Sequence, residues 1–177
     1  MPRVPILSRA ELAEADRDIY DDYERVRGVQ PSVIHRAIAN APDILRAYMP
    51  ISNALRFETR LDARLRELAI VMVGHLTGSA YEVEAHARFA IKAGVPQAQL
   101  DQLPEFASSP VYGDRERAVL RYAAEVTRRN QVSSGVLAAL QAEFDQEEIT
   151  ELALQVGFYN TVVRILGAFA IQPERRS

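Results

Sequence analysis

The chain has 177 residues, of which 48% are hydrophobic and 25% are charged, and this balance predicts one globular domain spanning residues 1–177. The formal net charge is only -3 and no long basic block occurs, so no nucleic-acid partner is expected. The sequence contains no cysteine, which excludes disulfides, thiolate metal sites and thiol-based catalysis.

The N-terminal segment 1–22 turns acidic after a short apolar patch and lacks the long apolar stretch of a signal peptide. Later apolar runs are too short to span a bilayer, or are interrupted by Asn160 and Arg164. We therefore expect no membrane partner, and a soluble protein of the reducing cytoplasm.

Nearly every segment repeats its apolar residues at the helical period, so the predicted fold is all-α. The expected helices cover, in chain order, residues 10–27, 31–40, 41–57, 62–77, 79–93, 95–103, 114–130, 133–144 and 145–171. Ser8 and Glu11 form a capping box for the first helix, and Asp145 and Glu148 form one for the last. Pro50 is expected to kink or break the third helix because it removes a backbone donor.

The helix expected over 62–77 is apolar on every side from Leu68 to Val73, which marks a central buried element. Glu67 lies at the edge of this apolar run. We expect this helix and the next one to form a central buried pair.

In that next helix, Glu82 and His86 stand four residues apart and fall within the broad apolar arc. Glu84 and Arg88 belong instead to a charged stripe typical of a solvent face. Because burying an unpaired charge is costly, Glu82 and His86 must find partners in the core or line a cavity. Structural roles are also open: Glu82 could form a capping box with Ser79, and His86 could donate to a core carbonyl.

The stretch RLRELAIVMVGHLTGSAYEVEAHARFAIKAGVP resembles the carboxymuconolactone decarboxylase family, whose wider superfamily includes thiol peroxidases related to alkylhydroperoxidase D. The resemblance rests on the Arg-Glu-Leu start, the Tyr-Glu pair, the histidine four residues later and the Ala-Gly-Val end. It is strongest over 60–96 and extends more loosely to both ends of the chain. It implies an alkylhydroperoxidase D-like helical fold.

In the peroxidase branch a Cys-x-x-Cys-x-x-x-His motif opens the corresponding helix, and aligning on His86 places the cysteines at Ser79 and Glu82. Neither is cysteine, so thiol peroxidase activity is not expected. Glu67 matches the family's upstream glutamate, and His86 matches its histidine.

The resemblance implies a decarboxylase-like lyase of aromatic compound catabolism, acting without a cofactor on a small unsaturated lactone or carbonyl acid. Glu67, Glu82 and His86 are the candidate catalytic residues, a set suited to general acid–base chemistry. His86 would donate or relay the proton, Glu82 would be its partner or base, and Glu67 would orient or reprotonate them.

Tyr81, His75 and Arg164 are weaker candidates for binding the substrate. A guanidinium such as that of Arg164 can hold a carboxylate bidentately, but Arg164 also suits a helix contact or a subunit salt bridge. His75 could face the same cavity as Glu67, although core packing explains it better.

Two other functions remain open. A metal site of Glu67, Glu82, His86 and His75 has suitable ligand types, but the sequence lacks an H-E-x-x-H or E-x-x-H element, so no metal is predicted. The other is a non-catalytic oligomeric scaffold or small-ligand binder of the same fold. The resemblance implies trimers or hexamers, which the small-residue face near Arg164 also suits.

Overall fold

The computed structural model describes residues 1–173, and this range contains helices and no strand. The all-α prediction is therefore confirmed. The helices fall into two compact units: unit 1 comprises Met1–Glu58 and Ile165–Gln172, and unit 2 holds Thr59–Arg164. The single domain expected over residues 1–177 stays a prediction.

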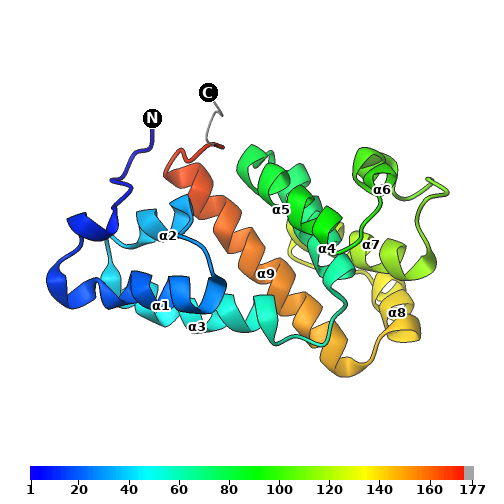
Figure 1. Cartoon of the computed structure of the whole chain (residues 1–177). Coiled ribbons are helices and arrows are strands. Elements are labelled where there is room, and N and C mark those ends of the chain that lie inside the picture. The colour runs from blue at the N-terminus through cyan, green and yellow to red at the C-terminus, as the bar shows by residue number, and fades with distance from the viewer. Residues whose placement is uncertain (174–177) are drawn as a thin grey trace. The chain divides into compact units, whose positions relative to one another are not determined.

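Unit 1 begins later as an α-helix than the sequence predicts. Its elements are η1 (Arg9–Glu11), η2 (Glu14–Asp16), α1 (Asp18–Arg27), α2 (Val33–Ile38) and α3 (Pro42–Phe57), shown in Figure 1. The Glu11 carboxylate accepts from the Ser8 N–H at 2.7 Å, as expected of a capping box, yet only a 3-10 turn follows. The expected helix over 10–27 is therefore wrong in its first two turns.

Pro50 does not break its helix. α3 runs without interruption from Pro42 to Phe57 with Pro50 inside it. Pro50 is exposed, and on the solvent side of a helix water can replace the backbone hydrogen bond that a proline removes. The expected kink or break is corrected accordingly.

Unit 2 carries the remaining helices, and their order follows the prediction. They are α4 (Ala63–Thr77), α5 (Ala80–Lys92), α6 (Gln97–Asp101), η3 (Leu103–Glu105), α7 (Asp114–Arg129), α8 (Ser134–Glu143) and α9 (Gln146–Ala168), whose last four residues belong to unit 1. The predicted capping box of α9 is present, because Asp145 and Glu148 each accept from the other's backbone N–H at 2.9–3.0 Å.

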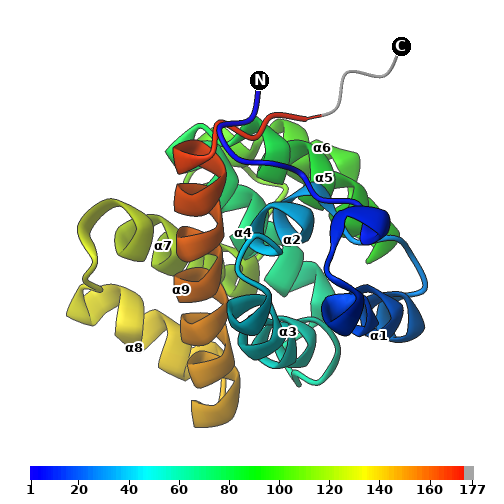
Figure 2. The same ribbon diagram turned by 90° about the vertical axis from the view of Figure 1, so that its left-hand side faces the viewer.

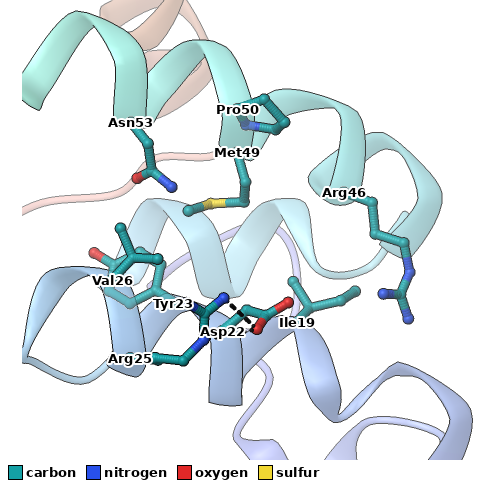
Figure 3. Close-up of a pocket in the computed structure, with 9 residues that line it drawn as sticks. All are labelled: Ile19, Asp22, Tyr23, Arg25, Val26, Arg46, Met49, Pro50 and Asn53. Atoms are coloured by element: carbon teal, nitrogen blue, oxygen red, sulfur yellow. Dashed lines mark hydrogen bonds and ion pairs between the residues drawn. The ribbon is translucent and has the colours of Figure 1, made fainter. Parts of the chain in front are cut away.

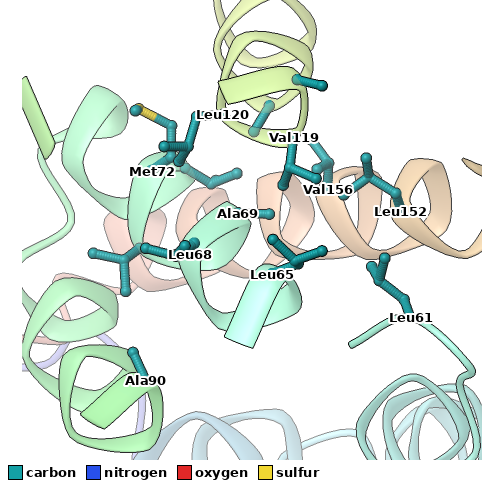
Figure 4. Close-up of a cluster of buried hydrophobic side chains, with 14 of the residues drawn as sticks. Leu61, Leu65, Leu68, Ala69, Met72, Ala90, Val119, Leu120, Leu152 and Val156 are labelled. Carbon is teal, nitrogen blue, oxygen red and sulfur yellow. The ribbon is translucent and has the colours of Figure 1, made fainter. Parts of the chain in front are cut away.

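α4 is the centre of unit 2, as its uniformly apolar run predicts. It packs against both α5 and α7. α7 in turn packs against α8, and Figure 2 shows these two helices side by side. Figure 4 shows Leu68 and Met72 of α4 among side chains from α7 and α9. Burying such side chains contributes about 1.5–3 kcal/mol each, so α4 is a rigid platform for any polar group it carries.

In the described part of the chain, no helix combines the length and apolar character needed to cross a membrane.

Candidate acid–base site

A glycine lets α4 and α5 approach closely at the site. A Cβ atom added to Gly74 would lie 3.1 Å from the Glu82 Cβ and 3.1 Å from the Val83 Cγ2. Real Cβ atoms rarely come so close, so only glycine fits this crossing without displacing α5. Gly74 therefore helps to hold Glu82 against α4.

Across this contact the structure brings together three ionisable side chains predicted from the sequence. The Nδ1 of His86 lies 2.6 Å from the Glu67 Oε2, and its Nε2 lies 3.3 Å from the Glu82 Oε2. All three residues are buried: Glu67 and His86 are 5% exposed and Glu82 is 3% exposed. The imidazole is thus bracketed by one carboxyl group from each helix.

The Glu67 contact fixes the orientation of the imidazole. The 2.6 Å distance is that of a hydrogen bond between Nδ1 and the Glu67 carboxyl group, and it leaves Nε2 facing Glu82. The ring also meets Tyr159 of α9 edge-on, with centroids 4.8 Å apart, and Phe89 at 5.4 Å. Packing and hydrogen bonding together leave the imidazole little freedom to rotate.

Arg66 stands behind Glu67. Its Nε lies 3.5 Å from the Glu67 Oε1, the carboxylate oxygen that does not face His86. The Arg66 side chain is only 14% exposed, so this contact is weakly screened by solvent. Arg66 was not among the predicted site residues, and the Arg-Glu-Leu start of the family resemblance was the signal for it.

Glu82 is the least satisfied member of the group. Its Oε2 approaches His86 at 3.3 Å but forms no hydrogen bond with any described residue. Burial raises the pKa of Glu82; the charge of Glu67 raises it further, and His86 partly offsets the effect. Glu82 therefore favours its protonated form more than an ordinary glutamate does.

The structural roles considered for Glu82 and His86 do not match this geometry. Ser79 is the N-cap of α5, but its side chain accepts no capping hydrogen bond, and the Glu82 side chain turns to His86 instead of back to the Ser79 backbone. His86 faces two carboxyl groups, not a core carbonyl.

Two of the weaker candidates, Arg164 and His75, lie outside this group. Arg164 is exposed and donates from Nη1 to the Asn160 carbonyl and Oδ1, at 2.6 and 2.9 Å. His75 is also exposed, which contradicts its expected place in the core or the cavity. It sits in the last turn of α4, past the tightly packed stretch that ends at Gly74. Tyr81 lies half-buried at the start of α5.

Among residues 1–173, no three His, Asp or Glu side chains are arranged to hold a metal ion.

A separate pocket of about 310 Å³ opens between α1 and α3 of unit 1, shown in Figure 3. Its lining contains none of the predicted site residues, and its Asp22 and Arg25 are already paired at 2.8 Å. The acid–base group of unit 2 is therefore the better candidate site.

Residues 42–125 match the profile of the Carboxymuconolactone decarboxylase family. The predicted resemblance to this family is confirmed over these residues. The matched segment contains Glu67, Glu82 and His86, while Tyr159 and Arg164 lie beyond it. No curated protein matches the chain significantly.

Solved structures agree on the fold. A protein of unknown function from Agrobacterium tumefaciens, described as a candidate antioxidant defence protein AhpD, is 25% identical with a TM-score of 0.73, over 78% of this chain and 96% of its own. A peroxidase-related protein from Ralstonia eutropha is 22% identical with a TM-score of 0.81, over 98% and 93%. The debrominase Bmp8, as a cysteine-to-alanine variant with 2,3,4-tribromopyrrole, is 18% identical with a TM-score of 0.82, over 97% and 91%. The alkylhydroperoxidase D-like fold is thus shown.

Proposed function

We propose that the protein is a carboxymuconolactone decarboxylase-like enzyme that performs general acid–base chemistry on a small unsaturated lactone or carbonyl acid. The observation that carries this proposal is the buried row of Glu67, His86 and Glu82, in which the Glu82 oxygen nearest the imidazole has no hydrogen bond. A buried carboxyl group with a raised pKa beside a positioned histidine is typical of proton-transfer sites.

Each residue has a distinct role in this scheme. Glu67 orients the imidazole through its 2.6 Å contact with Nδ1. Glu82, whose pKa is raised by burial, is the proton donor. His86 relays protons to and from Glu82 through Nε2, so the acid can be restored after each turnover.

Decarboxylation fits this equipment. The bond between the substrate's carboxylate carbon and the adjacent carbon breaks, carbon dioxide leaves, and the electron pair enters the conjugated lactone or carbonyl system. A proton from Glu82 then forms the new C–H bond, and Glu82 is reprotonated by a proton that His86 takes up from water and passes on through Nε2. Because the substrate takes up the electrons, this scheme requires no cofactor.

Thiol peroxide reduction is not part of the proposal. That chemistry needs a thiolate, and the sequence contains no cysteine. The similarity to the Bmp8 debrominase, at 18% identity, extends to the fold alone. Glu82 takes the place where the related peroxidases are expected to carry a cysteine.

The test is a screen of small unsaturated lactone and carbonyl acids, monitored for released carbon dioxide. For the best substrate, we expect Glu82→Gln and His86→Gln each to lower kcat about 100-fold or more, the usual contribution of general acid–base catalysis. Glu84→Gln is the matched control, because Glu84 lies on the same helix but is exposed and paired with Arg88. Circular dichroism should remain unchanged in all three variants, and full activity of both site variants would contradict the proposal.

A second candidate function is a non-catalytic small-ligand binder or scaffold of the same fold. It is favoured by the Glu67–His86 hydrogen bond, in which two buried groups satisfy each other without a substrate. Saturable binding of a lactone acid without any turnover would support this candidate.

We also propose that the protein self-associates and works in the cytoplasm. The exposed side of α9 supports self-association, since it carries Leu154, which is 52% exposed, and the small residues Gly157 and Thr161. The stoichiometry implied by the family resemblance is a trimer or hexamer.

A further inference from the structure

A second pocket, which lies in unit 2, has a mostly positive lining. It measures about 210 Å³ and is lined by residues that precede α7, by α7 itself and by the first turn of α8. Figure 2 shows α7 and α8 side by side. The lining residues are Phe106, Arg121, Ala124, Glu125, Arg128, Arg129 and Val136. None of them belongs to the Glu67–His86–Glu82 group.

The three arginines of this pocket form no close ion pair. None of Arg121, Arg128 and Arg129 forms a hydrogen bond or an ion pair with a described residue, whereas most other arginines of unit 2, such as Arg60 and Arg88, are paired. The protein as a whole is acidic, with a net charge of -3. Three exposed guanidiniums without a close ion partner therefore surround one hollow.

The acidic residue of the pocket is already engaged. Glu125 accepts from the Ser133 backbone N–H at 2.7 Å and from the Ser133 hydroxyl at 3.1 Å, so both of its oxygens are used where α8 begins. These bonds, together with the charge of Arg129, hold the pKa of Glu125 below its usual value. With one carboxylate against three guanidiniums, the lining keeps a net positive charge.

Helix-end effects explain only part of this arrangement. Arg128 and Arg129 lie in the last turn of α7, where cations complement the helix dipole. Arg121 lies two turns earlier on the same face as Arg128, where the dipole gives no reason for a cation. The first turn of α8, which supplies Val136, adds partial positive charge.

The apolar part of the lining limits what the pocket accepts. Phe106, Ala124 and Val136 offer an aromatic ring and two aliphatic surfaces beside the guanidiniums. Arginine pairs with phosphate through two parallel hydrogen bonds, and an aromatic ring packs well on another ring. The volume is below the usual range for drug-sized ligands, so the ligand is small or partly protrudes.

We propose that this pocket binds a small phosphate ester with an apolar or aromatic organic group. The phosphate lies among Arg121, Arg128 and Arg129, and the organic group lies against Phe106. This binding is independent of the proposed decarboxylase chemistry.

The test is isothermal titration calorimetry of the full-length protein at low salt with phenyl phosphate, inorganic phosphate and phenol. We expect phenyl phosphate to bind saturably and more tightly than inorganic phosphate, and phenol not to bind. Arg121→Gln and Arg128→Gln should each weaken phenyl phosphate binding about tenfold, since each removes charge-assisted hydrogen bonds. Arg88→Gln is the control, because Arg88 is paired with Glu84 on α5, and it should bind like the unmodified protein.

Two further measurements separate the parts of the proposal. Phe106→Leu should weaken phenyl phosphate binding but leave inorganic phosphate binding unchanged. In the unmodified protein, binding should weaken as salt is raised to about 0.5 M, because salt screens exposed charges. Absence of saturable binding, binding that does not respond to salt, or equal binding by the Arg121→Gln, Arg128→Gln double variant would overturn the proposal.

Discussion

The protein's two buried histidines show how surroundings set the chemistry of one residue type. His35 of unit 1 is 5% exposed, and burial together with the charges of Arg27 and Arg56 lowers its pKa to about 3, so it stays neutral. Its Nδ1 meets the Ser32 hydroxyl at 2.7 Å. His86 of unit 2 is equally buried but lies between two carboxyl groups. Of these two histidines, His86 is the one that contacts carboxyl groups.

The raised pKa of Glu82 makes a prediction about stability and pH. A carboxyl group with a raised pKa in the folded state binds its proton more tightly there, so its stabilising contribution is present below pH 4.5 and is lost as pH rises through the folded-state pKa. Glu82→Gln, which keeps a neutral side chain of the same shape, should therefore gain stability relative to the unmodified protein as pH rises above 4.5.

Urea denaturation at pH values from 4 to 8 measures this difference. Glu84→Gln is the control, and its difference from the unmodified protein should not follow the same trend, since Glu84 is exposed. A Glu82→Gln difference that stays flat across this range would show that the carboxyl group is not perturbed.

At the scale of the element, the site depends on the α4–α5 crossing. α4 supplies Glu67 from a stretch that is buried from Glu67 to Gly74, and α5 supplies Glu82 and His86 one turn apart. The N-cap Asp62 starts α4 by accepting from the Arg64 N–H at 2.8 Å. Between the helices, Gly74 sets how closely Glu82 approaches.

This crossing predicts opposite effects for two glycine-to-alanine changes. Gly74→Ala should destabilise the protein by about 1–3 kcal/mol, because the new Cβ meets Glu82 and Val83 at 3.1 Å and α5 must shift. Gly135→Ala in α8 should be neutral or stabilising by up to about 1 kcal/mol, since nothing lies within 4 Å of its added Cβ.

Thermal and urea unfolding give both values. Activity gives a second readout: Gly74→Ala should lower kcat by displacing Glu82, while Gly135→Ala should not. A Gly74→Ala variant as stable and as active as the Gly135→Ala variant would show that the helices do not need this close approach.

At the scale of the whole molecule, the exposed side of α9 is the surface we propose for self-association. Leu154, Gly157, Thr161 and Arg164 recur at helical spacing and are all exposed in the single chain. The Arg164 guanidinium bonds back to Asn160 on its own helix, so it is held away from Leu154. The small side chains of Gly157 and Thr161 allow another helix to pack closely.

A charge in this surface should therefore dissociate the protein. We expect the unmodified protein to sediment as an oligomer and Leu154→Asp to sediment as a smaller species, because the aspartate would lose its hydration in the interface. Leu137→Asp is the matched control, since Leu137 of α8 is also exposed, at 39%. Sedimentation of the unmodified protein as a monomer would contradict the proposal.

Much of the fold follows from the sequence because helical periodicity and capping are local properties. The apolar run of α4, the capping box of Asp145 and Glu148, and the order of the helices in unit 2 were all predictable. Local signals failed where context competes with them. Ser8 starts only a 3-10 turn, and α3 continues through Pro50 because that residue faces solvent.

For the site, the sequence by itself determined that Glu82 and His86 share the inner face of one helix, since residues four apart always do so in an α-helix. Only the tertiary structure decided what they meet. Glu82 turns toward His86 instead of capping its helix, because Gly74 brings α4 close enough for Glu67 to hold the other imidazole nitrogen. The tertiary structure also decided that Arg66 contacts Glu67 and that His75 is exposed. The direction in which a helix face points depends on the neighbouring helices, which local sequence does not encode.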